Sequence, residues 1–216
     1  MQILTRERLD VFGDTTSACE ALAKKDKCLA RALAVIGHPH IRRRPGGFEA
    51  LFRIIIEQQV SVASAQAIFA RCRKGIDPFS PARVIELGEE GLRPFGLSRP
   101  KIRYVTALAE RVIANDLDLD GLPDLSDDDA SAVLQSIKGI GPWTAAIYLL
   151  FCEGRVDIWP AGDVALLGAY RAARLRGPMP EMQQFDERAA RWAPWRGVAA
   201  HILWTYYANI RGRTPI

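Results

Sequence analysis

The hydrophobic positions along this chain recur mostly at the three-to-four-residue spacing of α-helices. Between Thr15 and Ile36 the apolar residues follow this spacing and predict one helix, which the glycines and prolines of segment 37–47 end. We expect that segment, which contains three consecutive arginines, to be an exposed basic loop. The stretch Phe48–Ile56 is apolar with few gaps. It predicts a buried helix rather than a strand, because the pattern runs on through Glu57 to Gln59 before a short break.

The rest of the chain continues the helical pattern. Ser126 precedes three aspartates and is expected to cap a helix, since acidic residues are favourable in a first turn. No alternating strand pattern with hairpin turns is present, so the predicted fold is all-α. Other helices are expected at about Val62–Lys74, Pro81–Gly88 and Ser98–Asn115, with a turn at Pro94–Gly96.

Composition narrows the class of protein. With 216 residues, 49% of them hydrophobic, the chain is long enough for one large domain or two small lobes. Its apolar runs are shorter than the ~20 residues that cross a bilayer, and its first ten residues are too charged for a signal peptide, so we expect a cytoplasmic location and no membrane partner. The four cysteines are scattered and form no CxxC pair, and no HExxH spacing occurs, which argues against zinc and iron–sulfur sites.

Charge is distributed unevenly. The net charge is +4, and seven aspartates between Asp116 and Asp129 account for −7, so the other residues together carry +11. A basic body with one acidic, outward-facing turn is compatible with a polyanionic partner such as nucleic acid. An ordinary solvated surface explains the same charges equally well.

Two features of the segment from Leu134 to Tyr170 indicate chemistry. In Ile137–Pro142, two glycines allow positive φ angles and Pro142 suits the first position of a helix, which predicts a helix, a tight hairpin and a second helix. The free amides of that second helix are suited to a DNA phosphate, although an ordinary helix–helix turn has the same pattern. Asp163 follows at another expected helix start, where the helix dipole and backbone donors favour an ionised carboxylate. Its simplest alternative role is to cap that helix.

These segments resemble the helix-hairpin-helix base-excision DNA glycosylases, and within them the 3-methyladenine DNA glycosylase II branch. The similar stretches are FEALFRIIIEQQVS, PFGLSRPKI, LQSIKGIGPWTA, WPAGDVAL and RWAPWRGVAAHILWTYY, which follow one another in the family's order over about residues 48–207. Only 47 residues precede Phe48, too few for the additional N-terminal β-rich domain of larger members. The resemblance therefore implies the compact form, a single domain over residues 1–216 in which two helical lobes flank a DNA- and base-binding cleft.

The resemblance also implies roles for individual residues. Asp163 matches the catalytic carboxylate, which supports the oxocarbenium-like sugar or activates water. Trp143 stands where strand-cleaving members have a nucleophilic lysine, so base removal without strand cleavage is expected. Trp143 and Trp204 match rings of a pocket for alkylated purines, whose positive charge is attracted by aromatic faces, although Trp204 suits a core position equally well. A pocket tyrosine of a relative falls on Ile147 here, which leaves the pocket shape and the substrate range open.

Other implied roles concern DNA and a cation. A flipped-out base leaves a gap in the duplex, and Gln59 matches the wedge that fills it, with Gln58 as its neighbour; the alternative is two polar residues at a helix end. The backbone carbonyls of Gln135, Ile137 and Gly139 match those that hold a structural Na⁺ or K⁺ between hairpin and phosphate in relatives, and no other cofactor is expected. The DNA-contacting residues predicted in this way are Gln58, Gln59, Lys101, Gly139, Ile140, Gly141 and Thr144.

The sequence thus predicts a monomeric, monofunctional DNA glycosylase that removes alkylated purines from double-stranded DNA containing damaged bases. Two alternatives remain: a glycosylase for oxidised or mismatched bases on the same scaffold, and a non-catalytic helix-hairpin-helix DNA-binding protein. The sequence does not rank 3-methyladenine against 7-methylguanine, hypoxanthine or ethenoadenine.

Overall fold

The computed structural model describes residues 15–213, and this range contains helices and turns but no β-strand. The predicted all-α architecture is therefore confirmed. The chain divides into two compact units, a central unit made of Arg44–Tyr148 and a terminal unit made of Met1–Arg43 together with Leu149–Ile216. Within the described range, none of the helices combines the length and the apolar character that a membrane span requires.

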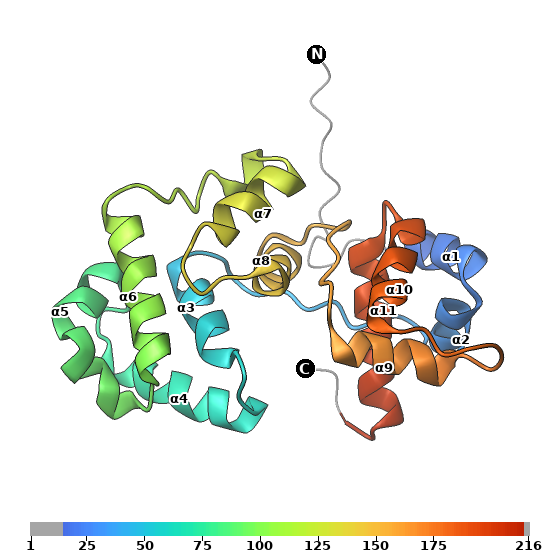
Figure 1. Cartoon of the computed structure of the whole chain (residues 1–216), viewed down its shortest axis with the longest axis horizontal. Helices are drawn as coiled ribbons and strands as arrows, with labels where there is room; N and C mark the ends of the chain where they lie inside the picture. The colour runs from blue at the N-terminus through green and yellow to red at the C-terminus, as the bar shows by residue number, and fades with distance from the viewer. Residues whose placement is uncertain (1–14, 214–216) are drawn as a thin grey trace, which may run out of the picture. The chain divides into compact units, whose positions relative to one another are not determined.

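The central unit is built around α3, which packs against α4, α6 and α8. α6 also lies along α5, as Figure 1 shows in green. Leu51, Phe52, Ile54, Ile55 and Ile56 of α3 are 0–1% exposed, which explains why this helix is apolar with few gaps. The helices of this unit are α3 Phe48–Glu57, α4 Val62–Gly75, α5 Pro81–Leu92, α6 Arg99–Ile113, α7 Asp127–Gln135 and α8 Pro142–Tyr148, with short 3₁₀ turns η1 Arg93–Phe95 and η2 Leu122–Asp124.

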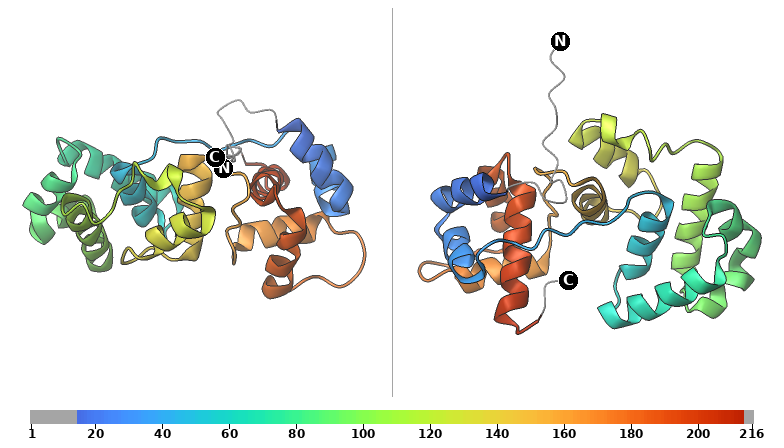
Figure 2. Two further views of the ribbon diagram at one scale, coloured as in Figure 1. Left: turned by 90° about the horizontal axis from the view of Figure 1, so that it is seen from above. Right: turned by 180° about the vertical axis from the view of Figure 1, so that it is seen from behind.

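The terminal unit is organised around α11, which packs against α9, α2 and α1. Figure 2 shows α11, in red, beside these helices in both views. Its core includes Leu22, Leu29, Tyr170, Phe185 and Trp192. The helices of this unit are α1 Thr16–Lys25, α2 Lys27–Ile36, α9 Val164–Ala173, α10 Met182–Ala189 and α11 Arg196–Ile210, with a π-helical turn η3 Leu149–Glu153 and a 3₁₀ turn η4 Ala190–Trp192.

The prediction of one continuous helix over residues 15–36 is wrong, because Asp26 interrupts it. Asp26 has an extended backbone and caps α2, accepting a hydrogen bond from the N–H of Cys28 at 2.8 Å. Its other carboxylate oxygen accepts from the hydroxyl of Tyr170 at 3.1 Å and from the indole N–H of Trp192 at 3.4 Å. Arg188 forms an ion pair with the same oxygen. The break therefore exists because this buried carboxylate ties α2 to α9 and η4.

The remaining helix boundaries mostly follow the sequence pattern. Ser126 caps α7 as predicted, accepting from the N–H of Asp129, and most of the aspartates before and after it are exposed. The helix that begins at Pro81 is longer than predicted and reaches Leu92 across a non-helical Gly88 with a φ of 58°. The helix that begins at Phe48 is shorter than predicted and ends at Glu57 rather than running on to Gln59. The contacts that end it belong to the candidate site.

Candidate functional site

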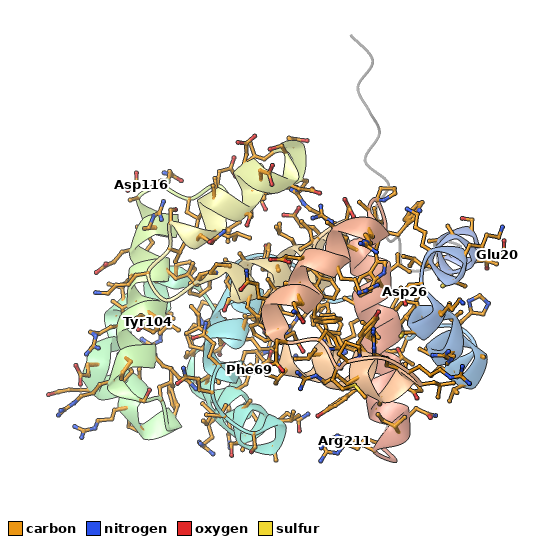
Figure 3. The ribbon with its side chains drawn as sticks, turned by 45° about the vertical axis from the view of Figure 1, so that its right-hand side comes forward. Glu20, Asp26, Phe69, Tyr104, Asp116 and Arg211 are labelled. Carbon is orange, nitrogen blue, oxygen red and sulfur yellow. The ribbon has the colours of Figure 1, made fainter. Side chains whose placement is uncertain are left out.

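The glycine hairpin lies in the central unit between α7 and α8. Gly139 has a φ of 91°, and a Cβ atom there would lie 2.4 Å from Cγ of Tyr104, so both the backbone conformation and the close approach of this ring require glycine. Tyr104 extends from the middle of α6 (Figure 3). Gly141 does not use the conformational freedom of a glycine, because its φ is not positive, and a Cβ there would meet no atom within 4 Å. The side chain of Ile140 is buried, and its N–H donates to the carbonyl of Ile137 at 3.0 Å.

The hairpin exposes one charged side chain, that of Lys138, together with the glycine at its end. Gly141, Pro142 and Trp143 are exposed, and Pro142 begins α8 as predicted. Of the carbonyls expected to hold a monovalent cation, that of Ile137 accepts from Ile140, and that of Gly139 accepts from the side-chain amide of Gln58 at 3.0 Å. A carbonyl oxygen has two lone pairs, so each keeps one for a further partner. Within residues 15–213, His, Cys, Asp and Glu side chains form no group of three suited to a metal ion.

The turn after α3 is held by contacts with other segments of the central unit. The side-chain amide of Gln58 donates to the carbonyl of Gly139 and to the hydroxyl of Thr144 at 3.1 Å. The ammonium of Lys101 donates to the carbonyl of Ile56 at 2.6 Å, and its partial burial lowers the pKa of this group. Thr144 is only 5% exposed. The polar groups of these three predicted DNA-contacting residues are therefore engaged inside the unit.

Gln59 differs from these three residues. It is exposed, and its φ of 54° lies in the left-handed region, which is uncommon for a residue other than glycine. Gln58 is extended immediately before it, so the chain reverses sharply at this point instead of continuing the helix. The bonds made by Gln58 and Lys101 hold this conformation and present Gln59 at the surface of the turn.

Two positions of the predicted base pocket, Trp143 and Ile147, lie on α8. Trp143 is the second residue of the helix and is 40% exposed, which is unusual for so large an apolar side chain. Ile147, one turn further on, is 4% exposed and belongs to the buried face. Trp143 is thus partly exposed, whereas the residue at the position of the relative's tyrosine is packed in the protein.

Asp163 lies in the terminal unit at the N-terminus of α9, and its two carboxylate oxygens have different partners. Oδ1 accepts hydrogen bonds from the N–H groups of Ala165 at 2.8 Å and Leu166 at 2.9 Å, so Asp163 caps the helix. Oδ2 accepts from the indole N–H of Trp204, on α11, at 3.3 Å. The side chain is mostly buried, with 8% of the residue exposed. One oxygen is therefore fixed by the backbone, and the other is directed towards an aromatic ring.

A second carboxylate, which the sequence reasoning missed, holds the loop before Asp163. Asp186 of α10 accepts from the indole N–H of Trp159 at 2.9 Å and from the N–H of Gly162 at 3.0 Å. Trp159 in turn packs edge-on against Phe185. No local pattern marks Asp186, because the groups that it bonds are 24 to 27 residues away along the chain.

The Trp204 ring is surrounded by a cluster that also includes Phe151, His201 and Arg42. The ring centroids of Phe151 and His201 lie 5.5 Å and 5.7 Å from that of Trp204. Burial lowers the pKa of His201 to about 4, and Nδ1 of its ring lies 2.8 Å from the carbonyl of Gly197. Arg42 comes from the basic loop, which was expected to be exposed, but its three arginines are half-buried. Its guanidinium carbon lies 5.8 Å from the Trp204 centroid.

Taken unit by unit, these features suit chemistry on a nucleic acid. The central unit carries an exposed turn with a protruding glutamine, an exposed indole and a hairpin with exposed backbone. The terminal unit carries a carboxylate that three donors hold in one orientation. Such a carboxylate stabilises positive charge that develops on a neighbouring group, or accepts a proton from water, without first having to reorient.

Comparisons with known proteins agree with this description. Residues 52–194 match the family model described as HhH-GPD superfamily base excision DNA repair protein. The chain is 27% identical over 212 residues to a Schizosaccharomyces pombe protein named DNA-3-methyladenine glycosylase 1, a match that covers 94% of this chain and 92% of the relative.

Two solved structures are similar over nearly the whole chain. The DNA-3-methyladenine glycosidase of Bacillus halodurans matches with a TM-score of 0.79 at 27% identity, over 94% of this chain and 95% of that one. The 3-methyladenine DNA glycosylase of Schizosaccharomyces pombe in complex with abasic DNA matches with a TM-score of 0.79 at 28% identity, over 88% of this chain and 96% of that one. The family model covers well over half of the chain, and the chain therefore belongs to the HhH-GPD superfamily of base excision DNA repair proteins.

Proposed function

We propose that this protein is a DNA glycosylase that hydrolyses the N-glycosidic bond of alkylated purines in duplex DNA and so begins base excision repair. The names of the similar proteins support the substrate class, and the relative bound to abasic DNA supports the product, since an abasic site is what base removal leaves. The observation that carries the proposal is the geometry of Asp163, a mostly buried carboxylate held by two backbone N–H groups and one indole.

The reaction places positive charge where Asp163 can stabilise it. As the bond between the sugar and the purine breaks, its electron pair leaves with the base and the sugar becomes oxocarbenium-like. The Asp163 carboxylate stabilises this sugar, and water adds to it and transfers a proton to the carboxylate or to solvent. Because Oδ1 is committed to the helix N-terminus, we assign this role to Oδ2.

The rings of Trp143 and Trp204 are proposed to bind the flipped-out base. Alkylated purines such as 3-methyladenine and 7-methylguanine are cationic, and an aromatic face attracts a cation by about 0.5–2 kcal/mol. The hydrogen bond between Trp204 and Asp163 fixes the orientation of that indole relative to the carboxylate. The base would thereby be placed at a defined distance from the group that assists its departure.

Binding to double-stranded DNA is proposed to use Gln59 and the hairpin. Gln59 is exposed in a strained turn, which suits a wedge that fills the space left by the flipped nucleotide and hydrogen-bonds to the unpaired base. Backbone N–H groups of Gly139 and Gly141 would contact a phosphate, with Na⁺ or K⁺ bound at the neighbouring carbonyls. We assign Gln58 and Lys101 a positioning role, because their polar groups hold the turn that carries Gln59.

The decisive experiment measures release of 3-methyladenine and 7-methylguanine from methylated DNA by the purified protein. We expect release by the wild type and a loss of about 10²-fold or more in the Asp163→Asn variant, since one charge-stabilising group is removed. The exposed Asp128 provides a matched control, because Asp128→Asn makes the same chemical change at the surface of α7. Absence of release by the wild type, or unchanged release by Asp163→Asn, would rule out the proposal.

A second measurement tests whether the DNA strand stays intact. Trp143 occupies the position where strand-cleaving members have a lysine, so we propose that no Schiff base forms with the sugar. Nicking of the product strand should then require added alkali or another enzyme. Trapping of a covalent protein–DNA adduct by borohydride would contradict this part of the proposal.

A further inference from the structure

One positively charged side chain of the terminal unit lies on the aromatic cluster beside Asp163. The guanidinium carbon of Arg42 is 5.4 Å from the ring centroid of Phe151 and 5.8 Å from that of Trp204. The indole N–H of Trp204 is in turn bonded to Oδ2 of Asp163 at 3.3 Å. A single indole therefore connects a fixed positive charge to the proposed catalytic carboxylate.

The histidine in this cluster adds no second positive charge at neutral pH. His201 is 1% exposed, and its pKa is lowered to about 4, chiefly by burial and to a smaller extent by the positive charge of Arg42. His40 also contributes to this lowering and lies near the cluster, with its backbone N–H bonded to the hydroxyl of Thr205. Arg42 is therefore the cation that remains on these rings when His201 is neutral.

We infer that Arg42 is a specificity-determining residue that favours neutral damaged purines, such as hypoxanthine and ethenoadenine, over purines that are already cationic. The inference rests on the proposed function, because it assumes that the base stacks beside Trp204. A ring face that already holds a guanidinium gains less from a second cation, and two positive charges beside the same ring repel each other. A cationic base would have to bind against that repulsion, whereas a neutral base would not.

The charge of the departing base shows at which step the two classes of lesion differ. When the bond between C1′ and N9 breaks, its electron pair stays on the purine, so a neutral purine leaves as an anion and later takes a proton from solvent. A cationic 7-methylguanine leaves as a neutral molecule instead. In both cases water adds to the oxocarbenium-like sugar and gives up its proton. In both cases the base gains one negative charge as it departs, so a guanidinium beside it assists departure from the bound complex to the same extent. The discrimination therefore lies in binding, where only a cationic base is repelled.

The test compares two lesions on the same protein preparation. Second-order rate constants of base release, at protein concentrations well below saturation, are measured with two duplexes of identical sequence, one containing hypoxanthine and the other 7-methylguanine. For Arg42→Met, which keeps the apolar stem and removes the charge, we expect the ratio of the hypoxanthine rate to the 7-methylguanine rate to fall by about tenfold or more, equal to about 1.4 kcal/mol. Arg42→Lys, which keeps a positive charge, should retain most of the ratio. Because both rates come from one preparation, partial unfolding of a variant changes them equally and leaves the ratio unaffected.

Arg211→Met is the matched control. Arg211 also lies on an aromatic ring of the terminal unit, 4.5 Å from the centroid of Tyr207, but at the C-terminal end of α11 (Figure 3). Its substitution should leave the ratio unchanged. An equal fall of both rates in Arg42→Met, an unchanged ratio, or a wild type that releases 7-methylguanine but no hypoxanthine would overturn the inference and leave the proposed function standing. A wild type that releases neither of these bases nor 3-methyladenine would overturn the proposed function itself, and one that releases only 3-methyladenine would overturn the inference alone.

Discussion

Replacing Gln58 by methionine removes one side-chain amide and nearly preserves the length and volume of the side chain. In the wild type this amide donates to the carbonyl of Gly139 at 3.0 Å and to the hydroxyl of Thr144 at 3.1 Å. A neutral hydrogen bond contributes about 0.5–1.5 kcal/mol net, and a buried acceptor left unpaired costs about 1–3 kcal/mol. Because Thr144 is 5% exposed and the Gly139 carbonyl keeps access to other partners, we expect a total loss of about 2 kcal/mol. For a chain of this size that corresponds to a midpoint of thermal unfolding lower by about 4–8 °C.

Two assays on Gln58→Met and on the neighbouring Gln59→Met distinguish a side chain that stabilises the turn from one that contacts DNA. Thermal unfolding should detect the loss at Gln58 but show little change at the exposed Gln59. Single-turnover release from a fully paired duplex should be slowed by both variants, because one loosens the turn and the other removes the wedge's hydrogen-bonding group. Placing an abasic site opposite the lesion makes flipping easier and should restore part of both rates. If Gln58→Met unfolds like the wild type and binds undamaged DNA more weakly, Gln58 is a direct DNA contact and the reasoning is wrong.

Three further predictions follow from single contacts. Gly139→Ala should lower the free energy of unfolding in urea by about 1–3 kcal/mol, because of its positive φ and the Tyr104 ring, whereas Gly141→Ala should change it little. Between pH 6.5 and about 4, His201 binds a proton in the unfolded chain but not in the folded protein, where it is buried. The free energy of unfolding should therefore fall by up to about 3 kcal/mol as the pH is lowered through this window. His201→Phe should remove this part of the pH dependence of stability. Asp26→Ala should cost about 3 kcal/mol or more in urea unfolding, and Asp26→Asn, which keeps an oxygen for the cap, should cost less.

Much of the fold is predictable because the interactions that define it are local. Helix spacing, the cap at Ser126 and the proline that begins α8 depend on residues within one turn of each other. The predictions are wrong where residues far apart along the chain determine the local structure. Asp26 breaks a helix because its partners Tyr170 and Trp192 are 144 and 166 residues away along the chain. Residues such as these show no pattern in a short window of sequence.

The candidate site likewise contains residues that the sequence could identify and contacts that it could not. Asp163 was identifiable because the segment around it resembles a family and because its capping bonds are made within three residues. Its surroundings were not predictable in the same way. Asp186 of α10 holds the neighbouring Gly162, and the bond of Trp204 to Asp163 comes from α11, although the resemblance had already named Trp204 as a pocket residue. Arg42 shows the same limit: the sequence placed it in a basic loop, whereas only the three-dimensional structure places its guanidinium on the Trp204 ring.

The structure also changes how the two sequence-based interpretations of Asp163 relate to each other. A helix cap and a catalytic carboxylate looked like alternatives, but the two oxygens of this side chain have separate partners, so the proposed catalytic role is compatible with the cap. The backbone donors on Oδ1 fix the carboxylate plane at the N-terminus of α9. Holding a negative charge in a mostly buried position normally requires compensation by hydrogen bonds. Here the compensation comes from a helix that the fold needs in any case, so the charge that the proposed reaction requires is already oriented before DNA binds.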